Sequence, residues 1–301
     1  PLVSTALMLV TAAKVAGVRN IVVGMPPQPD GSVNASTVAA ASLAGADDFV
    51  VGNGVAIIAG FSIGTDSVKE VEAIYGPGPQ GIAAAMSIAF SYGKRTVVGI
   101  GPTDCAIIAD ESIDSDWLAA DLLCEGEHGM DSSALLVTTS EDLAYDVEKA
   151  LQKRITEVDE SRRDIVKTVF GEKGMGAVAL VPDMKTACEL INDYAPEHLL
   201  IACADENQKA VLERIENSGE ILLGKYTPFS AANYSIGITA VLPTNGFARS
   251  FSGITSKDMI KTSTIGSLSG SALKKLRQSI EGLGQHEGLP CHVEAMRVRL
   301  K

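Results

Sequence analysis

The sequence predicts an α/β fold with parallel sheets. Short apolar segments rich in Val and Ile alternate along the chain with Ala-rich or amphipathic helical segments. The strand-like segments are apolar almost throughout, which is typical of strands buried on both faces of a parallel sheet. After Gly224 the alternation stops, and a stretch rich in Gly, Ser, Thr and Asn precedes a tail with helical periodicity.

The first hundred residues alternate helix and strand. The expected helices are 5–16, 34–43, 55–61 and 80–91, and the expected strands are 20–24, 48–52, 71–75 and 95–100. Gly17 supplies a helix stop signal, and three prolines make 25–33 a loop. Because Gly101-Pro102 ends the last of these strands, residues 1–102 are interpreted as a first Rossmann-like α/β domain.

A second alternating set follows, and residues 103–250 are interpreted as a second Rossmann-like domain. The expected strands are 105–109, 134–138, 176–181, 198–202 and 220–223, and the expected helices are 115–125, two within 140–170, 184–192 and 206–217. The charge runs of 140–170 are typical of solvent-exposed helix faces. The stretch 226–252 is too long for an idle loop, which indicates a functional role. Residues 251–301 are expected to form a helical extension, with one helix over 272–281.

Composition excludes several classes of function. A formal net charge of −12 and a pI near 4.8 oppose nucleic acid or an anionic membrane surface as a partner. The five cysteines are scattered and contain no C-x-x-C pair, so neither a disulfide framework nor a thiolate zinc site is indicated. The first twenty residues lack the basic start of a signal peptide, and no apolar run is long enough to span a membrane. A cytoplasmic protein is expected.

Glu197 and His198, in the stretch Tyr-Ala-Pro-Glu-His, are the leading candidates for acid-base residues. They lie where an expected helix meets an expected strand, and Pro196 restricts the backbone that presents them. A histidine beside a glutamate in a rigid connection suits a base with a second acid-base group next to it. The alternative is a loop histidine with a solvated neighbour.

Two further patterns could bind a ligand. Glu125 and His128 are three residues apart at an expected helix end, so both could face one divalent metal such as zinc, or could simply form a polar helix terminus. Two glycine turns, Gly52-Asn53-Gly54 and Gly76-Pro77-Gly78, each follow a strand and open a helix, where free N–H groups favour a pyrophosphate. Neither turn is a full G-x-G-x-x-G, and glycine there can serve turn geometry alone.

Five segments together resemble the histidinol dehydrogenase family. They are IYGPG (74–78), EHGMDS (127–132), YAPEHL (194–199), VLPTNG (241–246) and EGLPCH (287–292), in the family's order and spacing across essentially the whole chain. The resemblance implies a zinc- and NAD-dependent alcohol dehydrogenase acting on a small molecule. It also implies a homodimer in which the C-terminal helical segment reaches into the partner's active site.

The resemblance also assigns roles to residues. The histidine matching His198 is the general base, and the glutamate matching Glu197 activates water when an aldehyde-level intermediate is oxidised further. His128 and His292 match zinc ligands, and Glu287 matches a glutamate that binds substrate.

The chain departs from the family pattern near each of these functions. Glu125 stands where the family has a glutamine ligand, and Asn233 stands where it has an aspartate, so the two changes offset in charge. One carboxylate, one amide and two imidazoles remain, which is a workable shell for zinc. Other altered positions lie toward substrate (Thr103, Thr239 and Ala240) and toward NAD (Val55 and Pro79).

Three hypotheses about function follow. The leading one is a zinc- and NAD-dependent dehydrogenase acting on a polar alcohol that need not be histidinol, in one or two steps. The second is a true L-histidinol dehydrogenase of histidine biosynthesis. The third is a metal- or ligand-binding relative without enzymatic activity, suggested by Val55 and Pro79 and by the domain-scale N-terminal segment that family members carry before the position of Pro1. We expect that the sequence is truncated there.

Overall fold

The computed structural model describes residues 3–97, 99 and 101–301. It forms two compact units, Pro1–Ile260 and Lys261–Lys301, which are treated separately below. Helices alternate with strands through the first unit, and every strand pairing is parallel. The predicted α/β fold with parallel sheets is therefore confirmed.

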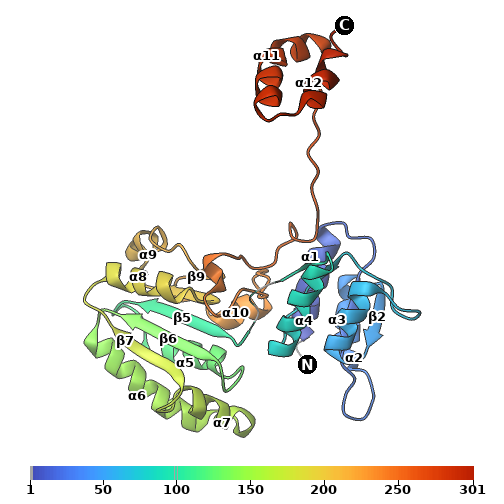
Figure 1. Cartoon of the computed structure of the whole chain (residues 1–301). Coiled ribbons are helices and arrows are strands. Elements are labelled where there is room, and N and C mark those ends of the chain that lie inside the picture. The colour runs from blue at the N-terminus through green and yellow to red at the C-terminus, as the bar shows by residue number, and fades with distance from the viewer. Residues whose placement is uncertain (1–2, 98, 100) are drawn as a thin grey trace. The chain divides into compact units, whose positions relative to one another are not determined.

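The main sheet of the first unit has five parallel strands. They are β5 (Asp104–Ala109), β6 (Ser133–Thr138), β7 (Met175–Leu180), β8 (His198–Ala202) and β9 (Glu220–Leu223), in the spatial order β7-β6-β5-β8-β9 (Figure 1). Numbered along the chain this order is 3-2-1-4-5, which is the order found in doubly wound dinucleotide-binding sheets. The bounds of the interpreted domain, 103–250, stay a prediction.

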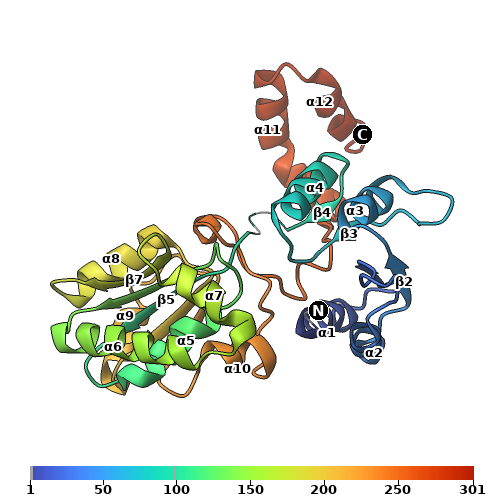
Figure 2. The ribbon, with the colours of Figure 1, turned by 90° about the horizontal axis from the view of Figure 1, so that it is seen from below.

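Helices cover both faces of this sheet (Figures 1 and 2). One face carries α5 (Ser115–Gly126), α6 (Glu141–Glu157) and α7 (Glu160–Val169), and the other carries α8 (Met184–Tyr194) and α9 (Asp205–Leu212). The central strand β5 alternates accordingly. Ile107 packs in the α5–α6 core and Ile108 packs in the α8 core, and both are fully buried. This burial on both faces explains why β5 is apolar at nearly every position.

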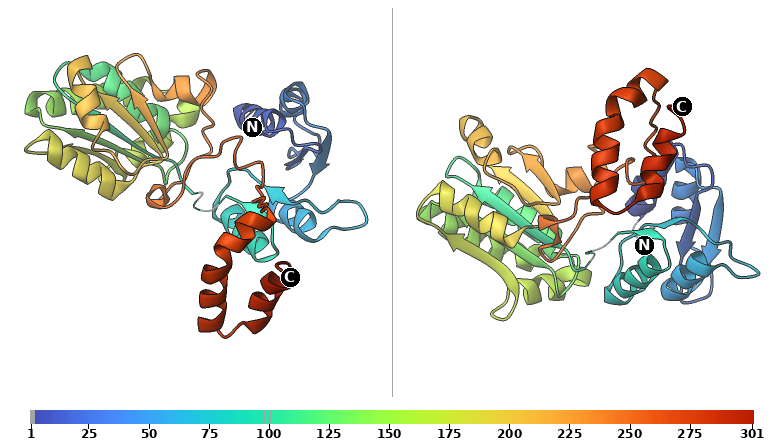
Figure 3. Two further views of the ribbon diagram at one scale, coloured as in Figure 1. Left: turned by 90° about the horizontal axis from the view of Figure 1, so that it is seen from above. Right: turned by 45° about the horizontal axis from the view of Figure 1, so that its top comes forward.

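The N-terminal part differs from the prediction. Its elements are α1 (Val3–Val15), β1 (Val22–Met25), α2 (Ala35–Ala44), β2 (Asp48–Val51), α3 (Gly54–Ile63), β3 (Ala73–Ile74), α4 (Gln80–Ser91) and β4 (Arg95–Thr96) (Figure 3). The four strands form two separate parallel pairs, β1-β2 and β3-β4, rather than one Rossmann-like sheet. The strands expected at 71–75 and 95–100 are two residues each, and positions 98 and 100 lie outside the described residues.

The polar segment after β9 contains a helix that its composition did not indicate, α10 (Phe229–Tyr234), and a 3-10 turn, Phe247–Arg249. Val241, Ile254 and Met259 from this region join the hydrophobic core formed by α1, α3 and α4. The segment therefore links the main sheet to the N-terminal core, and the prediction of a domain boundary at residue 102 stays a prediction.

The second unit contains the helices α11 (Gly270–His286) and α12 (Pro290–Arg297), which pack against each other. Helix α11 is longer than the expected 272–281, and the unit begins ten residues after the predicted start of the extension at 251. Across the described ranges, no helix has the length and apolar character needed to cross a membrane.

Candidate active site at the amino ends of the central strands

Three adjacent strands begin with ionisable residues, and these residues lie together. Asp104 starts β5, His198 starts β8 and Glu220 starts β9. His198 pairs in register with Cys105 on one side and with Glu220 on the other. Because all the strands are parallel, their first residues share one edge of the sheet. This is the edge opposite to the one where doubly wound sheets usually bind ligands.

The connection that carries Glu197 is held in an unusual backbone conformation. Ala195 ends α8 with a φ of 52°, in the left-handed region, and Pro196 follows it. The amide of Glu197 then donates to Oδ1 of Asp104 at 2.6 Å, and the amide of Asn245 donates to Oδ2 at 2.6 Å. Asp104 therefore fixes both the 194–197 connection and the VLPTNG loop at the sheet edge.

His198 is enclosed by three carboxylates, and the residue is 3% exposed. Its Nδ1 lies 2.5 Å from Oε1 of Glu220. Its Nε2 lies 3.6 Å from Oε1 of Glu197 and 3.8 Å from Oε2 of Glu125. Phe229 of α10 packs edge-on against the ring, with centroids 5.9 Å apart. The structure thus brings together the two predicted acid-base residues and one predicted metal ligand.

Each of the three carboxylates keeps one buried oxygen without a hydrogen-bond partner. These oxygens are Oε2 of Glu125, Oε2 of Glu197 and Oε2 of Glu220. The described ion pairs of these glutamates involve histidine only, with no Lys or Arg. Since a buried carboxylate is costly unless a cation or donor compensates it, the cluster is built to receive positive charge.

The same charges shift the acid-base properties of the pair. Burial raises the pKa of Glu197, and although His198 opposes this, Asp104 and Glu125 add to the rise, so that it reaches about 8. Burial lowers the pKa of His198, but Glu197, Glu125 and Glu220 outweigh it and raise the pKa to about 10. In the absence of another cation, the imidazolium is the positive charge that these carboxylates stabilise.

Glu125 and His128, the pair that could face one metal, lie close together. Glu125 is fully buried in the last turn of α5, and its Oε2 lies 3.5 Å from Nε2 of His128. Asn233, on the unpredicted helix α10, donates its Nδ2 to Oε1 of Glu125 at 2.8 Å. The amide oxygen of Asn233 remains as a candidate donor to a cation. The unpartnered Oε2 of Glu125, the imidazole of His128 and this amide oxygen fit the oxygen and nitrogen shell that zinc accepts.

The candidate metal ligands are divided between the two units. Across residues 3–97, 99 and 101–301, no three His, Cys, Asp or Glu side chains form a metal-binding group by themselves. The fourth predicted ligand, His292, and the predicted substrate residue, Glu287, belong to the second unit and are exposed there. The first unit therefore supplies three of the four candidate donors.

The two glycine turns, alike in sequence, differ at the helix ends that they open. Asn53 caps α3, because its side chain accepts from the amides of Val55 at 3.0 Å and Ala56 at 3.4 Å. Pro79 precedes α4 and provides no side-chain cap. The amides of Gln80 and Gly81 at the start of α4 are therefore the ones open to an anion, since the amide of Ile82 already donates to the carbonyl of Pro79. The turn Gly76-Pro77-Gly78 is the stronger candidate for cofactor contact. Gly52 and Gly54 flank the capped end.

A groove of about 700 Å³ reaches the edge of the site. One wall is α1, and the other walls come from β9, α10 and the segments 234–242 and 252–256. Glu220 lines the groove and is the only charged residue among the described lining residues, and Thr239 lines it as well. Thr103, predicted to contact substrate, is half-buried next to Asp104. The volume suits a small organic ligand.

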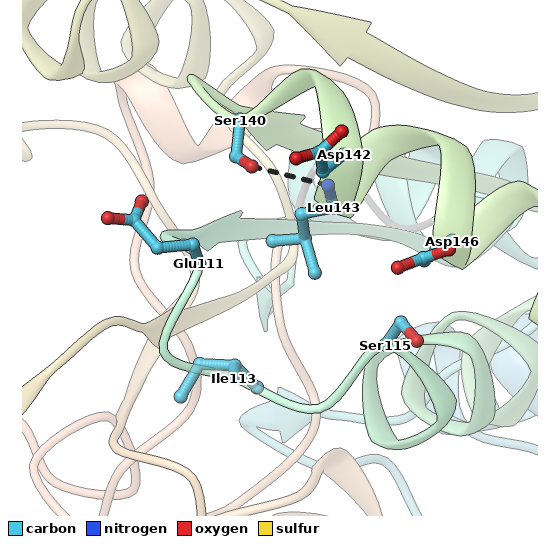
Figure 4. A pocket seen from close by; sticks show the side chains of 7 residues that line it. All are labelled: Glu111, Ile113, Ser115, Ser140, Asp142, Leu143 and Asp146. Atoms are coloured by element: carbon cyan, nitrogen blue, oxygen red, sulfur yellow. Dashed lines mark hydrogen bonds between the residues drawn. The ribbon is translucent and has the colours of Figure 1, made fainter.

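A second pocket, of about 390 Å³, lies at the opposite, carboxyl edge of the sheet (Figure 4). It is lined by Glu111, Asp142 and Asp146 together with the hydroxyls of Ser115 and Ser140. The hydroxyl of Ser140 caps α6 by accepting from the amide of Leu143, and the carboxylates are open to solvent. Ser140 thus serves the start of α6, and the pocket contains none of the predicted site residues.

Sequence reasoning missed Glu220 and Asp104. A local signal existed, since each is an acidic residue directly before an apolar run. What brings them to His198, however, is the order of the strands in the sheet, and a single sequence does not reveal which strands are neighbours.

Comparison with known proteins assigns a family. The family model described as histidinol dehydrogenase matches residues 1–300. The histidinol dehydrogenase of Bacteroides thetaiotaomicron is 38% identical over 301 residues, covering 100% of this chain and 68% of that protein. That of Synechocystis sp. is 38% identical, covering 98% of this chain and 67% of that protein. The crystal structure of histidinol dehydrogenase from Elizabethkingia anophelis matches with a TM-score of 0.94 at 31% identity, covering 100% of this chain and 68% of that chain.

Proposed function

Because the chain belongs to the histidinol dehydrogenase family, whose members depend on NAD and zinc, we propose that it is an NAD- and zinc-dependent oxidoreductase that oxidises L-histidinol. The comparisons support L-histidinol as the substrate better than they support another polar alcohol, which was the leading hypothesis from the sequence. The relatives named above are all called histidinol dehydrogenases.

The observation that carries the choice of substrate is the charge of the site. Besides Glu125, which is assigned to zinc below, Glu197 and Glu220 each keep an unpartnered buried oxygen. Glu220 is also the only charged residue among the described residues that line the groove. Such a site attracts a cationic amino alcohol. It repels a hydroxy acid, because the carboxylate of that substrate would be buried beside the carboxylates of the protein. Histidinol carries the required ammonium group. A neutral polyol would gain nothing from these charges.

The ring of His198 is arranged to take a proton at Nε2. Its Nδ1 is occupied by Glu220, and Nε2 is the nitrogen that faces Glu197 and Glu125. In this proposal Nε2 accepts the hydroxyl proton of the alcohol. During a second oxidation to the acid, Glu197 accepts a proton from the attacking water. The raised pKa of Glu197 suits a carboxyl group that exchanges a proton near neutral pH.

Zinc would be held by Glu125, His128 and Asn233 of the first unit, with His292 as a further ligand. When bound, zinc lowers the pKa of the alcohol, polarises the carbonyl product and offsets the carboxylate charge that keeps His198 protonated. The orphan oxygen of Glu125 supports this assignment. Glu287 and Thr103 would contact the substrate.

For the cofactor, we propose that the turn Gly76-Pro77-Gly78 and the uncapped start of α4 approach the pyrophosphate of NAD, with Gly52 and Gly54 nearby. Bound NAD supplies the hydride acceptor. We also propose a cytoplasmic homodimer in which residues 251–301 contribute to a partner's site. The five cysteines are free, which is compatible with a reducing compartment.

The substrate test compares L-histidinol with an imidazole alcohol that lacks the amino group and with lactate. In zinc-loaded protein we expect NADH formation with L-histidinol and a kcat/KM about 10- to 100-fold lower without the ammonium group, the size of a lost charge-assisted hydrogen bond. Lactate should react more slowly still. Calorimetric titration with NAD is the control, because saturable binding shows that the cofactor site is intact. Equal rates for all three alcohols would contradict the charge argument.

The metal test measures zinc in the purified full chain by mass spectrometry. We expect about one zinc per chain, because the donor set matches a zinc site. In His128→Ala the zinc content should fall to less than about a third of that value, since a metal ligand is lost. His286→Ala, which removes an exposed histidine outside the proposed shell, is the matched control. Full zinc content in His128→Ala would refute this ligand set, and a folded chain that takes up no zinc would favour the binding-relative hypothesis.

A further inference from the structure

Glu220 and His198 are joined by the pairing of two strands. They are register partners at the first positions of β9 and β8, which places both side chains on the same face. Both are more than nine-tenths buried, and Oε1 of Glu220 lies 2.5 Å from Nδ1 of His198. A carboxylate can only accept a hydrogen bond, so the imidazole must carry its proton on Nδ1.

The backbone around this pair leaves little freedom. The amide of Gly219 donates to the carbonyl of Pro196, and the amide of Glu220 donates to the carbonyl of Glu197, both at 2.9 Å. A Cβ at Gly219 would lie 2.5 Å from the carbonyl oxygen of Glu197, so only glycine permits this close approach. The position of Glu220 is therefore fixed relative to the catalytic connection and does not depend on a flexible surface loop.

We propose that Glu220 is a positioning residue for the base: as a buried, acceptor-only group it holds the proton of His198 on Nδ1 and fixes the ring so that Nε2 is presented to the substrate. This inference rests on the proposed function and deepens it. Glu220 acts through His198 rather than on the reacting atoms.

Replacing Glu220 with Gln distinguishes this role from packing. Gln has nearly the same shape, but its amide can donate to Nδ1 and so allows the tautomer with the proton on Nε2, where the base is blocked. In zinc-loaded Glu220→Gln we expect kcat to fall about 10- to 100-fold, as for other carboxylates that orient a functional imidazole. KM for L-histidinol is expected to rise as well, because Glu220 is the charge that the groove presents to the ammonium group. The positioning role is therefore measured as kcat at saturating alcohol.

Glu220→Asp is the second variant. Asp is shorter, but like Glu it only accepts, so kcat should decrease in the order Glu, Asp, Gln. Glu213→Gln, at an exposed position of the same charge, is the control and should leave kcat unchanged. A rank order with Gln above Asp, or a kcat for Gln within twofold of the unsubstituted chain, would overturn the proposal.

Nuclear magnetic resonance gives a readout that does not need turnover. The chain has four histidines, so ¹⁵N-histidine labelling gives a short spectrum, and His198→Asn identifies the resonance of interest. We expect a low-field, exchange-protected Nδ1–H proton for His198 that is retained in Glu220→Asp and lost in Glu220→Gln. An unchanged resonance in Glu220→Gln would overturn the proposal. If the unsubstituted chain oxidised no alcohol, the proposed function would fail, while this resonance would still decide the role of Glu220.

Discussion

His198→Asn is expected to lower kcat about 10³-fold, the contribution of a well-placed general base. Asn places an amide N–H near the position of Nδ1, so the hydrogen bond to Glu220 can be kept, while the proton-accepting Nε2 is removed. KM for NAD should stay within about threefold, since the variant does not alter the glycine turns or α4. The effect is measured as the rate of NADH formation at saturating L-histidinol, in stopped-flow or steady-state experiments.

The fold of this variant has to be checked separately. The smaller Asn side chain leaves space beside Phe229. A weaker hydrogen bond to Glu220 also leaves the buried charge of that residue less well compensated. Together these changes should lower the free energy of unfolding by about 1–3 kcal/mol. Thermal unfolding followed by circular dichroism measures that loss, and zinc content shows whether the neighbouring site is intact. If the variant is folded and zinc-loaded yet keeps kcat within threefold, His198 is not the base.

Much of the main sheet was predictable because its signals are local. Each strand of β5 to β9 is a short apolar run bounded by helical segments, and the helix-to-strand connection at Glu197 and His198 was placed correctly. The three-residue spacing of Glu125 and His128, at the end of one helix, also indicated that they could lie close together. Features set within about one helical turn, or by strand alternation, can be read from a single sequence.

The errors arose where distant segments decide the structure. Helix α10 has six residues, too few for a helical period to be visible in a polar segment, yet it carries Asn233 and Phe229. Glu220 gains its role only through register with β8. The strands of the N-terminal part have the same local pattern as those of the main sheet, but they pair two by two. The two glycine turns looked equivalent until the cap at Asn53 distinguished them.

The exchange of Glu125 and Asn233 relative to the family pattern predicts a second large effect. The two side chains share a hydrogen bond of 2.8 Å, with the amide donating and the carboxylate accepting. Exchanging the carboxylate and the amide would keep this bond and reverse its direction. Glu125→Gln alone places two amides in contact and removes the only carboxylate of the shell. We expect zinc affinity to fall about 10²- to 10³-fold, comparable to breaking a buried ion pair by deleting one charge.

The double variant Glu125→Gln with Asn233→Asp should bring zinc affinity back to within about threefold of the unsubstituted chain, so that the coupling free energy exceeds about 1 kcal/mol. Competition titration against a chromophoric chelator gives all four dissociation constants of the cycle. Glu127→Gln, at the exposed residue that ends the same helix, controls for the loss of charge near the site. Losses that simply add would mean that Glu125 and Asn233 do not share one metal. Recovery would mean that the shell requires one carboxylate and one amide but tolerates either order, because the hydrogen bond between them holds both in place.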